Sequence, residues 1–321
     1  MDEIIKIIKE YLFKPKSKNE LKKAVNLWRE NKEEALNKYG HISNWDTSLI
    51  TDMSRLFEYS NFNENINDWD VSNVTNMSFM FYSCSNFNQP LDNWNVSNVT
   101  DMSGMFEYCF KFNQPLNDWV LSNITSMSRM FKNCQNFNQP LNNWDVSNVI
   151  YMSFMFSGCR NFNQPLDNWN VSNVTDMCGM FEYCFKFNQP LNNWNIGNVI
   201  NMRCMFFNCK KFNQPLNDWD VSNVTTMESI FNGCKKFNQL LNDWDVSNVI
   251  NMRCMFFNFK NFNQPLNVWD ISNVTTIERI FYACKNFNQS LNDWNISNGT
   301  NMIEMFDRCE KLNNIPHWYE Q

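Results

Sequence analysis

Residues 88–112 read Asn88-Gln-Pro-Leu-Asp-Asn-Trp94-Asn-Val-Ser-Asn98-Val-Thr-Asp-Met102-Ser-Gly-Met105-Phe106-Glu-Tyr-Cys109-Phe-Lys-Phe112, and the same pattern begins again at Asn113. Tryptophan marks the period. Ten tryptophans follow one another at intervals of 25 residues: Trp69, Trp94, Trp119, Trp144, Trp169, Trp194, Trp219, Trp244, Trp269 and Trp294. A fixed period between about 20 and 50 residues is typical of repeat proteins whose units stack only on their neighbours. The sequence therefore predicts a solenoid.

Each repeat contains two short patterns of apolar residues. Met102, Met105, Phe106 and Cys109 are spaced like one face of a short helix. Before them, Trp94-x-Val96 alternates apolar and polar residues as a short strand does. One repeat is too small to offset its own ordering entropy, so the array as a whole is predicted to be the folding unit.

The N-terminal residues predict a pair of helices. Residues 2–13 have amphipathic helical spacing, and the proline at position 15 interrupts it. Ser17 and Glu20 form a capping-box signal for a second helix, which Gly40 is placed to end. Terminal coils would otherwise expose an apolar face, and we therefore interpret these helices as a cap.

Composition limits the classes of function. The formal charge is −6, which argues against a nucleic-acid-binding protein. The N-terminus lacks the apolar core of a signal peptide, and no run of 18 apolar residues could span a membrane. We therefore expect an intracellular protein, in the cytoplasm of the producing cell or in a virion, with surface display the weaker alternative.

Nine of the twelve cysteines share one repeat position: Cys84, Cys109, Cys134, Cys159, Cys184, Cys209, Cys234, Cys284 and Cys309. Phe259 and Ser60 occupy this position in two other coils. A position that accepts phenylalanine is better explained by a buried apolar slot than by obligatory disulfides, so we predict free, mostly buried thiols.

The repeat resembles a known family. Its pattern Trp-Asp-Val-Ser-Asn-Val-Thr-x-Met-x-x-Met-Phe-x-x-Cys-x-x-Phe-Asn-Gln-Pro-Leu, over residues 41–318, is similar to the repeats of BspA-like bacterial surface proteins and mycoplasma-type lipoproteins. That family is an irregular branch of the leucine-rich repeats, and similar proteins are expanded in large DNA viruses and protists. The resemblance implies a parallel-strand solenoid with a helix in each coil, and a surface or interaction role. The chain differs from the bacterial members in lacking a signal peptide and a lipobox.

Taken together, these patterns predict an α/β solenoid of the irregular leucine-rich-repeat type. Each 25-residue coil would have one short parallel strand and one short helix. Residues 1–40 would form the N-terminal two-helix cap, residues 41–310 a solenoid of about eleven coils, and residues 311–321 a C-terminal cap.

One polar row is a candidate binding surface. If Trp and Val point into the core, the residue between them points outward, onto the predicted concave face. The row comprises Asp70, Asn95, Asp145, Asn170, Asn195, Asp220, Asp245, Asp270 and Asn295. It could bind basic partners or hold a weak calcium site, with a merely solvated face as the simpler alternative.

A second polar row contains the asparagines equivalent to Asn98, and seven of these begin Asn-x-Thr sequons. We interpret the row as structural, with each amide bonded to the turn backbone of an adjoining coil. Glycosylation would require secretion.

Catalytic residues are scarce. His41 and His317 are the only histidines and lie near opposite ends of the chain, so no histidine-based catalytic or metal cluster can form within one coil. We expect no enzyme activity, no cofactor and no metal. The leading hypothesis is a scaffold that binds a protein partner. The alternatives are a secreted or displayed adhesin and, more remotely, an inert product of repeat expansion.

Overall fold

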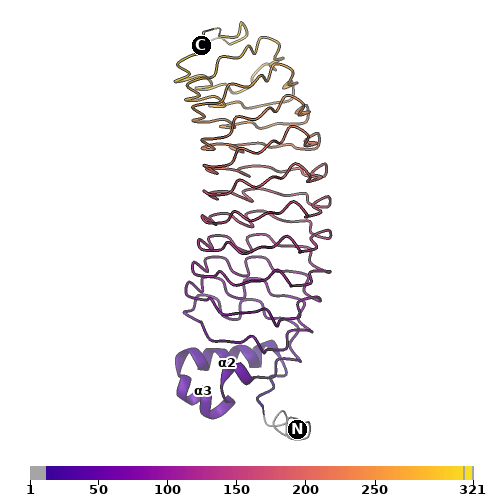
Figure 1. Ribbon diagram of the computed structural model, residues 1–321, viewed down its shortest axis with the longest axis vertical. Helices are drawn as coiled ribbons and strands as arrows, with labels where there is room; N and C mark the ends of the chain where they lie inside the picture. Colours follow the sequence, from indigo (N-terminus) through magenta and orange to yellow (C-terminus); the bar gives the residue numbers. More distant parts are fainter. Residues whose placement is uncertain (1–11, 314, 320–321) are drawn as a thin grey trace.

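The computed structural model describes residues 12–313 and 315–319. The chain forms an elongated stack of coils, with its helices at the N-terminal end (Figure 1). The helices in the described residues are α2 (Lys18–Glu30) and α3 (Lys32–Tyr39), followed by the short 3-10 helix η1 (Ile42–Asn44). The helix predicted over residues 2–13 lies almost wholly outside the described residues.

The second predicted helix begins and ends as expected but is broken in the middle. Ser17 accepts the N–H of Glu20, and the Glu20 carboxylate accepts the N–H of Lys16. Asn31 then ends α2 and begins α3, because its N–H donates to Leu27 while its side chain accepts from Glu34. The helices end at Gly40, which has φ 70°.

Successive coils are joined by a ladder of parallel β-bridges, one for each coil. The bridged residues are Asp52, Asn76, Asp101, Ser126, Tyr151, Asp176, Asn201, Thr226, Asn251, Thr276 and Asn301. Every bridge is isolated, so the described chain contains no extended strand or sheet. The prediction of one strand and one helix per coil is therefore wrong.

Consecutive turns replace the predicted helix. The N–H groups of Met102, Gly104 and Phe106 donate to carbonyls of the next coil at 3.1, 2.8 and 2.9 Å. Between these residues, the Met105 N–H returns to the Met102 carbonyl at 3.1 Å, which closes a turn. Alternate N–H groups thus bond between coils, whereas an α-helix would use them all within itself. The apolar spacing correctly predicts which side chains face inward, because side chains from successive turns also return to one side.

Two residues in each of these segments have positive φ. Gly104 has φ 59° and Tyr108 has φ 63°, and the equivalent residues of the other coils behave alike. An α-helix keeps φ near −63° throughout, so these positions exclude a helix geometrically.

The predicted strand is also made of turns. The Trp94 N–H donates to the Leu91 carbonyl at 3.2 Å, and the Val99 N–H donates to the Val96 carbonyl at 3.0 Å. The bridge lies further along the coil, at Asp101. The alternation of apolar and polar residues therefore indicates which side chains are buried. It does not indicate an extended backbone.

The core consists of columns of identical side chains. Trp169 stacks between Trp144 and Trp194, with ring centroids 6.4 and 6.3 Å away, and is only 2% exposed. Its indole Nε1 donates to the Leu141 carbonyl of the preceding coil at 2.9 Å. The tryptophans of the column are therefore core residues, which is the condition on which the outward direction of the candidate row depended.

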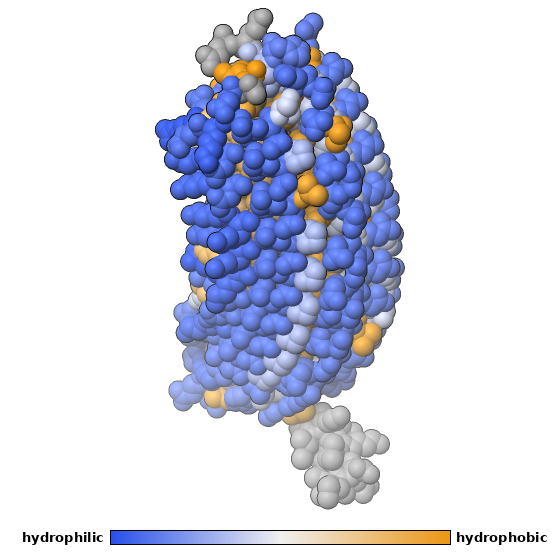
Figure 2. All heavy atoms as spheres, turned by 45° about the horizontal axis from the view of Figure 1, so that its top comes forward, coloured by the Kyte–Doolittle hydropathy of each residue, from blue (hydrophilic) through white to orange (hydrophobic). Residues whose placement is uncertain are grey.

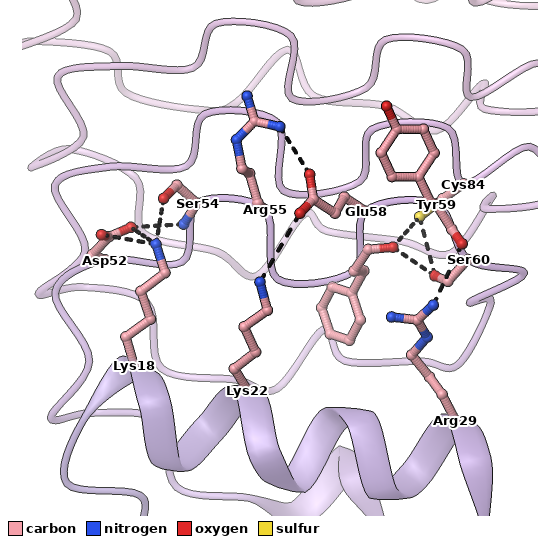
Figure 3. A network of polar contacts seen from close by, with 11 residues as sticks. Lys18, Lys22, Arg29, Asp52, Ser54, Arg55, Glu58, Tyr59, Ser60 and Cys84 are labelled. Atoms are coloured by element: carbon pink, nitrogen blue, oxygen red, sulfur yellow. Dashed lines mark hydrogen bonds and ion pairs between the residues drawn. The ribbon is translucent and has the colours of Figure 1, made fainter.

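Helix α2 covers the first coil with basic side chains (Figure 3). Lys18 Nζ lies 2.9 Å from Asp52 Oδ2 and also bonds Ser54 Oγ, while Arg29 Nη2 donates to the Tyr59 carbonyl at 3.4 Å. The first coil has no preceding coil to supply such donors. The cap therefore provides hydrogen-bonding partners as well as apolar cover.

We expect acid to weaken this cap. Burial tends to raise the pKa of Asp52, but hydrogen bonds from Ser54 and Lys18 outweigh it and hold the pKa below the ordinary 3.8. A lowered pKa in the folded protein contributes stability above about pH 4, which is lost as the pH falls through the folded pKa. The Tm difference between wild type and Lys18→Met should therefore be largest above about pH 4 and shrink below it. A difference that stays constant down to pH 2 would contradict this role.

Candidate binding surface

All nine residues of the candidate row are exposed, whereas the Trp and Val side chains that flank most of them are buried. The exposure of the row is thus as predicted. At the equivalent position in the coil between Asn95 and Asp145, the row is interrupted by Val120, which is 59% exposed. The binding role of the row stays a prediction.

Members of the row that begin a turn also stabilise it through a side-chain oxygen, which accepts a backbone N–H two residues further on. Asp145 Oδ1 accepts the N–H of Ser147 at 3.0 Å, and Asp220 Oδ1 accepts that of Ser222 at 3.1 Å. The side-chain and backbone hydrogen bonds from these serines lower the pKa of each aspartate. The carboxylates are therefore ionised at neutral pH, with one oxygen engaged in the turn.

The asparagine row forms the predicted structural ladder. Asn98 Nδ2 donates to the Ser72 carbonyl at 2.8 Å, and Asn173 Nδ2 donates to the Ser147 carbonyl at 2.7 Å. The same bond recurs in neighbouring coils. Each amide thus ties one turn to the turn of the preceding coil, while its residue remains exposed.

A groove runs along this face, which sequence reasoning missed. It has a volume of about 800 Å³ and crosses four coils. Its lining residues are Asn148, Ile150, Asn173, Thr175, Asn198, Ile200, Asn223 and Thr225. Ile150 and Ile200 replace threonine and are 36% and 49% exposed. The replacements are visible in the sequence, but only the stacking shows that they line one groove beside the candidate row.

The thiols are free, as predicted, and most point into the core. Cys159 is fully buried, and its Sγ donates to the Phe131 carbonyl at 3.0 Å. Burial raises its pKa far above the ordinary thiol value. Phe259 fills the equivalent slot in another coil at 1% exposure, in agreement with an apolar slot.

Alkylation should distinguish two classes of thiol. Cys178, Cys204, Cys254 and Cys309 retain some exposure, and burial raises the pKa of Cys178 and Cys309 to about 11 and that of Cys204 to about 12. We expect iodoacetamide at pH 8 to modify only these four in the native protein, and slowly, because the thiolate is the nucleophile. Peptide mass mapping would measure this. Rapid native modification of Cys159 would contradict the packing.

Within residues 12–313 and 315–319, no three His, Cys, Asp or Glu side chains are grouped closely enough to hold a metal ion. His41 adjoins η1, and His317 lies beside Asn292 at 3.3 Å, so the two histidines belong to opposite ends of the stack. Neither α2 nor α3 is long and apolar enough to cross a membrane.

Comparison with known protein families gives a match over most of the chain. The family model described as a Mycoplasma protein of unknown function, DUF285, matches three overlapping segments, residues 23–141, 116–219 and 200–318. No curated protein and no solved structure matches the chain. The three segments together span nearly the whole sequence. The chain therefore belongs to this Mycoplasma DUF285 family of repeat proteins.

Proposed function

We propose that the chain is a non-enzymatic scaffold that binds a protein partner along the groove and the adjoining candidate row. The groove carries the proposal, because it is continuous over four coils and combines apolar and hydrogen-bonding groups. Clefts with apolar walls and a few polar groups are the usual form of binding sites.

The lining indicates what the partner segment should offer. Ile150 and Ile200 can contact apolar side chains of a bound segment. The amides of Asn173 and Asn198 each use Nδ2 for a neighbouring carbonyl, so their Oδ1 atoms are placed to accept hydrogen bonds. Asp145, which belongs to the row beside the groove, adds negative charge. An extended segment with alternating apolar and basic residues would complement this surface.

The proposal is tested with a photo-crosslinking residue at position 175, in extracts of the native source. We expect a discrete crosslinked product that is lost in the double variant Ile150→Glu, Ile200→Glu. Ile250→Glu is the matched control, because Ile250 is exposed at the same repeat position but does not line the groove. Equal crosslinking by all three proteins would contradict binding in the groove.

A secreted or displayed adhesin is the second candidate. The BspA-like resemblance of the repeats favours it, and the sequon asparagines are exposed, as a glycan acceptor must be. The two candidates imply different compartments, because we propose that the scaffold acts inside a cell or a virus particle.

The intact mass of the protein from its native source distinguishes the intracellular scaffold from the adhesin. A bare chain of 38.5 kDa that takes up twelve alkyl groups when denatured without reductant would support the intracellular scaffold. A mass raised by glycans, or thiols blocked in disulfides, would favour the adhesin.

A further inference from the structure

A column of lysines runs along the C-terminal half of the stack. We call Lys210, Lys211, Lys235, Lys236, Lys260 and Lys285 the lysine column. All but Lys285 are exposed. Within the described residues, only Lys285 has an ion-pair partner, Glu310. Several positive charges thus lie one coil apart without neutralisation on a chain whose net charge is −6.

A column of aspartates lies in the same coils. We call Asp218, Asp220, Asp243, Asp245, Asp270 and Asp293 the aspartate column, and all six are exposed. In each coil the chain passes from the lysine column through Asn-Gln-Pro, or its equivalent, to the aspartate column. Phe212 and Leu216 point inward on either side of that connection, while Asn213 and Pro215 are exposed. The two columns therefore border one polar strip of surface.

The surface of the stack is organised in such columns. Figure 2 shows one face, on which hydrophilic residues run in parallel columns along the long axis and apolar residues are few. Beside these columns, equivalent rings of successive coils lie 6.0 Å apart at Phe212 and Phe237 and 6.5 Å apart at Trp244 and Trp269, so each column repeats its charges at about that interval.

We propose that this strip binds a second copy of the chain, with the lysine column of each copy against the aspartate column of the other. A two-fold axis parallel to the stack produces this pairing, because it exchanges the two edges of the strip while keeping coil opposite coil. A two-fold axis across the stack would place like charges together. The association is therefore a parallel, in-register dimer with a self-complementary interface.

Charge and spacing favour a second copy over an unrelated polyanion. The strip has six lysines and six aspartates, so a polyanion attracted by one column would meet the other. A second copy has the same spacing by construction, and its columns stay in register over every coil.

Sedimentation equilibrium of the full chain tests the dimer. We expect a monomer–dimer equilibrium at low ionic strength that shifts to monomer near 1 M salt, where the Debye length is about 3 Å. The variant Lys211→Glu, Lys236→Glu should raise the dimer dissociation constant by about tenfold or more, and so should Asp218→Lys, Asp243→Lys. Lys186→Glu is the matched control, because its coil has Asn192, Asn193 and Asn195 where the others have aspartates.

Mixing the two charge-reversed variants gives the decisive result. Each variant should dimerise more weakly alone than the wild type, and together they should form a heterodimer, because every reversed column then faces its opposite. This recovery also shows that both variants are folded. A wild-type chain that stays monomeric at low salt would overturn the proposal. So would a dimer indifferent to charge reversal, or a monomer whose lysine column binds only polyphosphate or heparin.

Discussion

Replacement of Trp169 by alanine should lower the free energy of unfolding by about 3–5 kcal/mol. The indole is buried and stacked between two other indoles, so its removal leaves a cavity in the middle of the column. The Leu141 carbonyl also loses its Nε1–H donor. Chemical denaturation monitored by circular dichroism measures the change.

Two further variants separate packing from hydrogen bonding. Trp169→Phe keeps most of the aromatic volume. It should lower the free energy of unfolding by less, about 1–3 kcal/mol, mainly because the Leu141 carbonyl is left unpaired. Trp318→Ala removes a half-buried tryptophan at the end of the column, which contacts one coil and not two, and should also lose less. A Trp169→Ala protein as stable as wild type would show that the column is not the core.

Gly158→Val should destabilise the protein by about 2–4 kcal/mol, through backbone strain and overpacking together. Gly158 has φ 75°, which a β-branched residue adopts only at a cost. A Cβ there would lie 2.2 Å from Asn133 Oδ1 and 3.3 Å from the Asn133 Cα of the preceding coil. The Cα belongs to the backbone ladder and has little freedom to move.

Gly158→Asn is the matched control. Asn133 and Asn208 occupy the same repeat position with φ 61° and 57°, so asparagine suits this conformation. We therefore expect a clearly smaller loss of stability than with valine, because asparagine avoids the backbone strain and only the close contact with Asn133 remains. Equal losses in the two variants would contradict the role of positive φ at this position.

The sequence predicts which side chains are buried better than it predicts the backbone. Met102, Met105, Phe106 and Cys109 are all fully buried, as their spacing indicated. Spacing of i, i+3, i+4 and i+7 indicates that the side chains lie on one side of the chain. A series of turns can place them there just as a helix does. A signal against the helix was available, because Gly158, Gly233 and the asparagines equivalent to Asn133 are residues that favour positive φ.

The prediction of a strand is wrong for a related reason. Trp94 and Val96 are both buried, yet their backbone forms turns, and the parallel bridge lies at Asp101. Alternation predicts a strand only where neighbouring backbones also pair, and pairing between coils depends on register, which single-residue patterns do not encode.

The candidate site was predictable in part. The outward direction of Asp145 and its equivalents followed from the buried Trp and Val beside them. The groove did not follow, because Ile150 and Ile200 are 50 residues apart in sequence and become neighbours of one cavity only through stacking. The lysine and aspartate columns likewise become continuous charged surfaces only when successive coils stack.

The measurement that tests the turn-built coil most directly is the set of backbone 13Cα chemical shifts of the deuterated protein. Among residues 12–313 and 315–319, the account predicts continuous helical shifts only within 18–30 and 32–39, with positive-φ signatures at residues such as Tyr108 and Asn133. Helical shifts that recur every 25 residues, over segments equivalent to 102–109, would contradict it and restore a helix to every coil.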